Sequence, residues 1–211
     1  MKNKKRFGFI LALALLVSAL FIFIAIAFKD DPFTVLGKFY KGNIERKAEV
    51  DDSKVLATVG GKRITQKLVD DYKMSYEIFG DKKSEEEIIK KIATDILLTK
   101  EAQEHNITVS DDEVSKVIED QMKLLKKTTT YKEFQNYLSG ADITEEEYIK
   151  IVTPIYKKLI IQGTYKNKIL KPDFKEKNND ISEAEFHNAF EDYYQKYKEK
   201  LFDNAEIKYL N

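Results

Sequence analysis

Residues that could carry acid–base or metal chemistry are sparse in this chain. It has two histidines, His105 and His187, and no cysteine, so neither a disulfide framework nor a thiolate metal site can form. His105 falls at a predicted helix end and His187 in an amphipathic segment, and neither is patterned with a second metal ligand. The acidic triplets at 85–87 and 145–147 fall in predicted first helical turns, where they favour the helix dipole. The sequence therefore predicts no catalytic residue, no metal site and no cofactor.

Aromatic side chains are the stronger functional signal, with 12 Tyr, 13 Phe and no Trp. They exceed what a narrow core-facing stripe needs, and Tyr combines a large apolar area with a polar edge. Two interpretations stay open, core packing and an apolar groove that holds extended or helical polypeptide. Methionines would add adaptable surface where exposed. The candidate polypeptide-binding residues are Met74, Tyr76, Phe79, Met122, Phe134, Tyr137, Phe186, Phe190, Tyr193, Tyr194 and Tyr197.

The N-terminus carries an unbroken apolar run, residues 7–28, after four basic residues within positions 2–6. As a helix this run is about 33 Å long, enough to cross a bilayer core. We expect a single-pass anchor in a bacterial cytoplasmic membrane, with a cytoplasmic N-terminus and an extracytoplasmic C-terminal domain. The triplet Ala25-Ile26-Ala27 keeps the alternative of a cleaved signal and a secreted protein open, although the run exceeds the usual ~7–15-residue signal core.

Charge is balanced, with 36 basic and 36 acidic residues. The four N-terminal basic residues contribute to that balance, so the exported part is mildly acidic. Nucleic acid is therefore not an expected partner, because its phosphates select basic surfaces.

Breaks in the periodicity divide the chain into four segments. Residues 1–28 form the expected anchor or signal. Residues 29–53 are predicted to be an ordered juxtamembrane linker, because Pro32, Gly37 and Gly42 interrupt any long helix. A short helix within residues 33–40 that lies on the membrane or on the domain stays open. Residues 54–170 form the main domain. Residues 171–211 carry a polar hinge, a C-terminal amphipathic helix and a short terminal strand.

The main domain begins with a predicted β-hairpin. The extended runs 55–59 and 62–65 flank Gly60-Gly61, and glycine tolerates the positive φ of a tight hairpin turn. The final residues, 205–210, also alternate like a strand. This strand could pair with the hairpin or with a second chain, so a homodimer through a strand edge stays open.

Helix starts are marked by a Ser or Thr followed three residues later by Glu, the capping-box pattern. The pattern begins at Ser84, Ser110, Thr130, Thr144 and Ser182. Pro154 lies inside an apolar-periodic segment that reaches residue 170, where it either kinks one helix or starts another. The expected fold class is mostly α: a helical bundle with a small β-hairpin, preceded by one N-terminal transmembrane helix.

Three motifs occur in a characteristic order. The hairpin V-L-A-T-V-G-G-K-R-I-T is followed by L-L-T-K-E-A with H-N-I-T-V-S-D-D-E-V, and then by Y-L-S-G-A-D-I-T-E-E-E-Y. In this order and spacing, residues 55–170 resemble the N-terminal chaperone domain of the SurA/PrsA-type foldases. The resemblance implies a helical domain that cradles unfolded exported chains.

In that family one or more parvulin-type prolyl isomerase modules usually follow. Here residues 182–210 resemble the lead-in to such a module and its first strand, and the sequence then stops at Asn211. No isomerase residue can be carried over, so no enzymatic activity is expected. The lipid-bearing cysteine of the PrsA type is also missing, and the N-terminal span would replace the lipid.

Two functions from different classes follow. The first is a membrane-anchored, extracytoplasmic chaperone-like protein that binds non-native or newly exported polypeptides through apolar and aromatic surfaces. The second is a structural or regulatory subunit that docks on one dedicated partner in a membrane or envelope complex. A prolyl isomerase is a third interpretation, which the end of the sequence disfavours.

Overall fold

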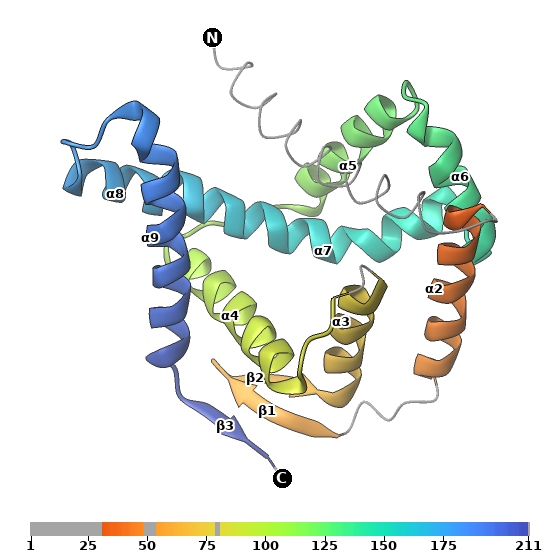
Figure 1. The fold of residues 1–211 in the computed structure, drawn as a ribbon, viewed down its shortest axis with the longest axis horizontal. Helices are drawn as coiled ribbons and strands as arrows, with labels where there is room; N and C mark the ends of the chain where they lie inside the picture. The colour runs from red at the N-terminus through yellow and green to blue at the C-terminus, as the bar shows by residue number, and fades with distance from the viewer. Residues whose placement is uncertain (1–30, 49–53, 79–80, 211) are drawn as a thin grey trace. The chain divides into compact units, whose positions relative to one another are not determined.

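The computed structural model describes residues 31–48, 54–78 and 81–210. This part of the chain is mostly helical with one small sheet, as the fold class predicts (Figure 1). The expected anchor, residues 7–28, lies outside the described residues. None of the described helices is long and apolar enough to cross a membrane. The described residues divide into two compact units, one with residues up to 48 together with 111–156, and the other with those between 54 and 110 together with 157–210.

The first unit contains α2 (Pro32–Ala48), α5 (Asp111–Leu125), α6 (Thr130–Ala141) and the first part of α7 (Glu145–Tyr165). Its α2 and α6 lie side by side in a contact made through glycine (Figure 1). A Cβ atom on Gly37 would lie only 2.5 Å from the backbone nitrogen of Ala141, beside the carbonyl oxygen of Tyr137.

The linker predicted over residues 29–53 is therefore a packed helix over most of its length. The residues predicted to interrupt a helix are compatible with α2. Pro32 lies in its first turn, where proline is tolerated, and Gly37 lets the backbones of α2 and α6 approach closely. The apolar residues of this segment allowed a short helix on the domain, but they could not identify its partner, because the backbone at Tyr137 and Ala141 lies about a hundred positions away.

The second unit contains an antiparallel sheet of β1 (Val55–Val59), β2 (Lys62–Thr65) and β3 (Ile207–Tyr209), in the order β2-β1-β3. The predicted hairpin is confirmed, and both turn glycines have positive φ. The terminal strand pairs with β1 of the hairpin, the first of the two partners considered for it. It thus adds a third strand to the predicted hairpin.

Four helical elements complete the second unit besides the end of α7. They are α3 (Gln66–Ile78), α4 (Glu85–Glu104), α8 (Lys171–Lys177) and α9 (Glu183–Asp203). A π-helical turn at Lys166–Leu170 joins α7 to α8. One core lies between the sheet, α3 and α4, and includes Val59, Ile64, Val69, Ile88 and Ile92. Another joins the end of α4 to α7, α8 and α9, and includes Ala102, Ile161, Tyr165, Phe174 and Phe190.

The capping boxes predicted at Ser84 and Thr144 form in full. The backbone N–H of Ser84 donates to the Glu87 carboxylate at 2.8 Å, and the N–H of Glu87 donates to the Ser84 hydroxyl at 3.2 Å. The same reciprocal pair joins Thr144 and Glu147, at 2.7 and 3.1 Å. The box at Thr130 does not form, because this residue is already inside α6.

Both prolines of the C-terminal half lie within helices. Pro154 is inside α7, which continues past it, and the hydroxyl of Thr153 donates to the Ile149 carbonyl at 2.7 Å. Pro172 occupies the first turn of α8, where its missing N–H is not needed. The polar hinge expected from residue 171 is therefore helical at its start.

The glycine contact between α2 and α6 can be tested with two variants in one helix. Gly37→Ala should lower the free energy of unfolding by about 1–3 kcal/mol, because the added methyl group meets backbone atoms. Gly42→Ala should be neutral or stabilise by up to about 1 kcal/mol, since the new Cβ would have no described atom from beyond its own helical turns within 4 Å. Urea unfolding followed by circular dichroism measures both, and equal stability of the two variants would contradict the contact.

Candidate functional site

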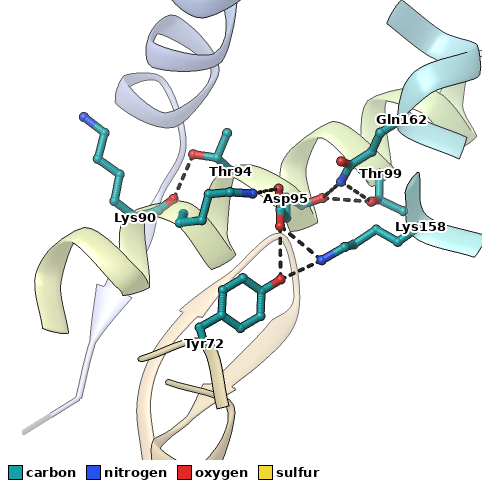
Figure 2. A network of polar contacts seen from close by, with 8 residues as sticks. Tyr72, Lys90, Thr94, Asp95, Thr99, Lys158 and Gln162 are labelled. Atoms are coloured by element: carbon teal, nitrogen blue, oxygen red, sulfur yellow. Dashed lines mark hydrogen bonds and ion pairs between the residues drawn. The ribbon is translucent and has the colours of Figure 1, made fainter. Parts of the chain in front are cut away.

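A buried carboxylate on α4 ties three helices of the second unit together (Figure 2). The Asp95 side chain, 9% exposed, accepts from the Tyr72 hydroxyl at 3.0 Å and from the ammonium groups of Lys91 and Lys158 at 2.6 and 3.1 Å. Lys158 also donates to the Tyr72 oxygen at 2.6 Å. The amide of Gln162 donates to the Asp95 carbonyl at 3.0 Å. This network fixes α3, α4 and the second-unit part of α7 against one another.

Burial and charge act in opposite directions in this network. Burial alone would raise the pKa of Asp95, but Lys91 and Lys158 outweigh it and hold that pKa below its usual value. Burial likewise opposes the charge of Lys158, yet Asp95 and Tyr72 keep the pKa of Lys158 above its usual value. Burial is also the main reason that the pKa of Tyr72 is raised, so its hydroxyl stays protonated and can donate. The ion pair is therefore charged throughout the neutral pH range.

Two hollows lie between α4 and α9. The larger, which we call the sheet groove, has a volume of about 830 Å³ and also borders the β1–β2 turn and the segment leading into β3. Its buried and half-buried apolar lining consists of Val59, Leu97, Tyr197, Leu201 and Ala205. Exposed charged residues surround this lining: Lys100, Lys200, Glu206 and Lys208. An apolar interior with a charged margin is the usual composition of a binding site.

The smaller hollow, which we call the lysine pocket, has a volume of about 380 Å³. Tyr76, Leu98 and Tyr194 contribute apolar surface, and Asp95 also lines it. Burial, followed by the charges of Asp95 and Glu191, raises the pKa of Tyr194 to about 12. That phenol is therefore neutral at physiological pH.

The aromatic face of α9 packs largely against the rest of the second unit. The Phe174 ring of α8 lies 5.6 Å from Phe186, 5.6 Å from Phe190 and 4.9 Å from Tyr193, measured between ring centroids. Phe190 is only 2% exposed. For Phe190 the core interpretation therefore holds, and its substitution would unfold this region rather than probe a binding surface.

The remaining candidates fall in different places. Tyr76 and Tyr194 line the lysine pocket, and Tyr197 lines the sheet groove. In the first unit Met122 and Phe134 are buried. The half-buried Tyr137 packs on Tyr148 with ring centroids 6.3 Å apart. The side chain of Met74 and the whole of Phe79 lie outside the described residues.

The two histidines have ordinary surroundings where the structure describes them. His105 Nδ1 lies 2.9 Å from the Glu101 carbonyl oxygen, and its ring is 5.2 Å from that of Tyr165. His187 is exposed on α9. No group of three or more metal-binding side chains occurs among the described residues.

Several residues that shape these hollows gave no signal in the sequence. Leu97 and Leu201 line the sheet groove and Lys90 and Lys198 line the lysine pocket, but none of them is among the predicted candidates. Exposed apolar side chains on α7 were also missed: Ile151 and Ile155 are 37% and 51% exposed in the first unit. A 3.6-residue period assigns a face to each residue, but it does not tell which face is left uncovered.

A family model described as the SurA-like N-terminal domain matches residues 1–154. The chain belongs to this family. The SurA-like domain is of a chaperone type that binds polypeptides. The matched range includes the α4 side of both hollows, whereas α9 and β3 lie beyond it. No curated protein and no solved structure matches the chain.

The Asp95 network yields a test of stability and its pH dependence. Asp95→Asn should lower the free energy of unfolding at pH 7 by roughly 2–4 kcal/mol, because Lys158 loses its partner in a partly buried site. The folded-state pKa is lowered, so the stabilisation is present above the usual Asp value of about 3.9. It should fade as the pH falls from there through the lowered pKa.

Glu104→Gln is the matched control, because Glu104 lies on the same helix in an exposed 3.6 Å pair with Lys100. It should cost less than about 0.5 kcal/mol. Urea titrations at several pH values measure both variants. A difference between wild type and Asp95→Asn that does not change between pH 7 and pH 3 would refute the assignment.

Proposed function

We propose that this protein is an extracytoplasmic chaperone-like protein that binds non-native or newly exported polypeptides. The observation that carries the proposal is the sheet groove, an apolar hollow with a charged margin in a member of the SurA-like family. The proposed activity is binding, and no catalytic step or cofactor is part of it.

The groove suits an unfolded segment for two physical reasons. Its apolar lining can take one or a few apolar side chains out of water, which is favourable for almost any unfolded sequence. Next to it, β3 forms an edge of the sheet, and Tyr209 and Leu210 are 54% and 47% exposed. An extended chain can add to such an edge through main-chain hydrogen bonds, which do not depend on sequence.

Binding of this kind is expected to be weak and broad. A disordered segment pays a conformational cost when it is ordered, so only part of the contact energy appears as affinity. Weak affinity allows a client to leave and fold without an energy source. The exposed pair Ile151 and Ile155 supplies further apolar contact surface in the first unit.

The proposed location rests on the N-terminal sequence. Residues 7–28 would hold the protein at a bacterial cytoplasmic membrane, and the basic residues before them would stay in the cytoplasm. The described domain would then face the compartment through which exported chains emerge. Cleavage of the same segment would give a secreted protein with the same binding surface.

Filling the sheet groove is the direct test. Asn204 is exposed and lines the groove, so Asn204→Trp should fill part of it without removing a core side chain. Asn188 is exposed on the same helix but lines neither hollow, which makes Asn188→Trp a matched control. The full chain should suppress light scattering by reduced, chemically unfolded lysozyme. Asn204→Trp should weaken this effect by at least about threefold in the concentration required.

Equal suppression by both tryptophan variants would contradict the groove as the binding site. No suppression by the unmodified chain would contradict the proposal as a whole. Circular dichroism on each variant separates loss of binding from loss of fold.

A further inference from the structure

The lysine pocket holds more cationic groups than its own acids neutralise. Its lining includes the four lysines Lys83, Lys90, Lys91 and Lys198. Two of them have carboxylate partners. Lys83 lies 3.4 Å from Asp81, and Lys91 lies 2.6 Å from Asp95.

The other two lysines have aromatic neighbours instead. The Lys90 ammonium lies 4.9 Å from the centre of the Phe202 ring, and the Lys198 ammonium lies 5.0 Å from that of Tyr194. Within the described residues, neither ammonium makes an ion pair or a hydrogen bond. A ring face attracts a cation but leaves its N–H groups able to donate elsewhere.

The acids of this region are already engaged, with one exception. Glu87 caps α4 through Ser84, and Asp95 binds Lys91 and Lys158. The remaining acid of the lining, Glu199, is exposed.

The charges packed around Lys198 also affect its pKa. Burial and the nearby Lys91 and Lys166 lower its pKa, and Asp95 and Glu191 oppose that shift without reversing it. Glu191 is bound to Lys166 at 2.7 Å. An anion in the pocket would therefore reduce the repulsion between Lys198 and the two other lysines, which Asp95 and Glu191 do not fully offset.

We infer that the lysine pocket binds a carboxylate group carried by a polypeptide, with Lys90 and Lys198 as its donors. This inference rests on the proposed function and names a chemical preference within it. The four lysines and three acids of the lining leave one net positive charge, which matches a single carboxylate better than a multiply charged phosphate. Tyr76, Leu98 and Tyr194 would contact the apolar part of the same segment.

Three labelled peptides test the inference by fluorescence anisotropy with the full chain at low ionic strength. The first is a nonapeptide of Gly and Ser with one Phe and one Asp, acetylated and amidated at its ends. The second has Asn in place of Asp, and the third is the Asn peptide with a free C-terminal carboxylate. The Asp peptide should bind about 5- to 10-fold more tightly than the Asn peptide. A preference for the third peptide alone supports the pocket and assigns its carboxylate to chain ends.

Variants then assign the preference to residues. The double variant Lys90→Gln with Lys198→Gln should reduce the preference to less than about twofold, and should leave the affinity of the Asn peptide unchanged. Lys175→Gln with Lys196→Gln removes the same charge from exposed positions outside the pocket and should keep the preference. Glu199→Gln removes a negative charge from the pocket lining, so it should increase the preference for the Asp peptide.

The outcomes separate this inference from the proposal on which it rests. Binding of the Asn peptide without any preference for a carboxylate overturns the inference and leaves the proposed function standing. A preference that survives the Lys90 and Lys198 changes, or a Glu199→Gln variant that shows no increase, also overturns it. Failure of all three peptides to bind contradicts both.

Discussion

The second unit depends on the contacts of the Asp95 carboxylate, whose pKa burial alone would raise. Asp95 is ionised because two ammonium groups and a phenol reach it from three helices. Tyr72 and Lys158 also bind each other, so the network requires one arrangement of α3, α4 and the second-unit part of α7. Buried ionic contacts add little net stability compared with apolar packing, but losing one partner is costly. We interpret this network chiefly as a device that fixes the position of α4.

The position of α4 matters because both hollows are built on it. The sheet groove uses Leu97 and Lys100, and the lysine pocket uses Lys90, Lys91 and Leu98. The opposing wall of each comes from α9, whose Phe190 is held in the core by α8. The buried faces of α4 and α9 hold the two helices in place. Other side chains between them therefore stay only partly covered. A site preformed in this way orders less of the protein on binding, which lowers the entropic cost of holding a client.

The sequence predicted contacts between residues close together in the chain, but not contacts between distant residues. The capping boxes at Ser84 and Thr144 and the glycine turn of the hairpin depend on residues within a few positions, so their patterns predicted them correctly. Asp95 looks like any helical acid, because Tyr72 and Lys158 lie 23 and 63 positions away.

The same limit applies to the candidate binding residues and to the predicted linker. The aromatic face of α9 was a good candidate for an open surface only while Phe174 was assigned to a polar hinge. Gly37 read as a helix breaker because the backbone it meets, at Ala141, is about a hundred positions away. Periodicity identified the apolar faces correctly, but which of them stay uncovered depends on packing partners that pattern alone does not supply.

Amide hydrogen exchange on the full chain, with and without reduced, unfolded lysozyme, would show where a client binds. We expect slower exchange in the bound state at residues 197–208 and in the β1–β2 turn, which border the sheet groove. Client binding with slower exchange only in α2, α5 and α6 would contradict it, since the contact would then lie in the other unit.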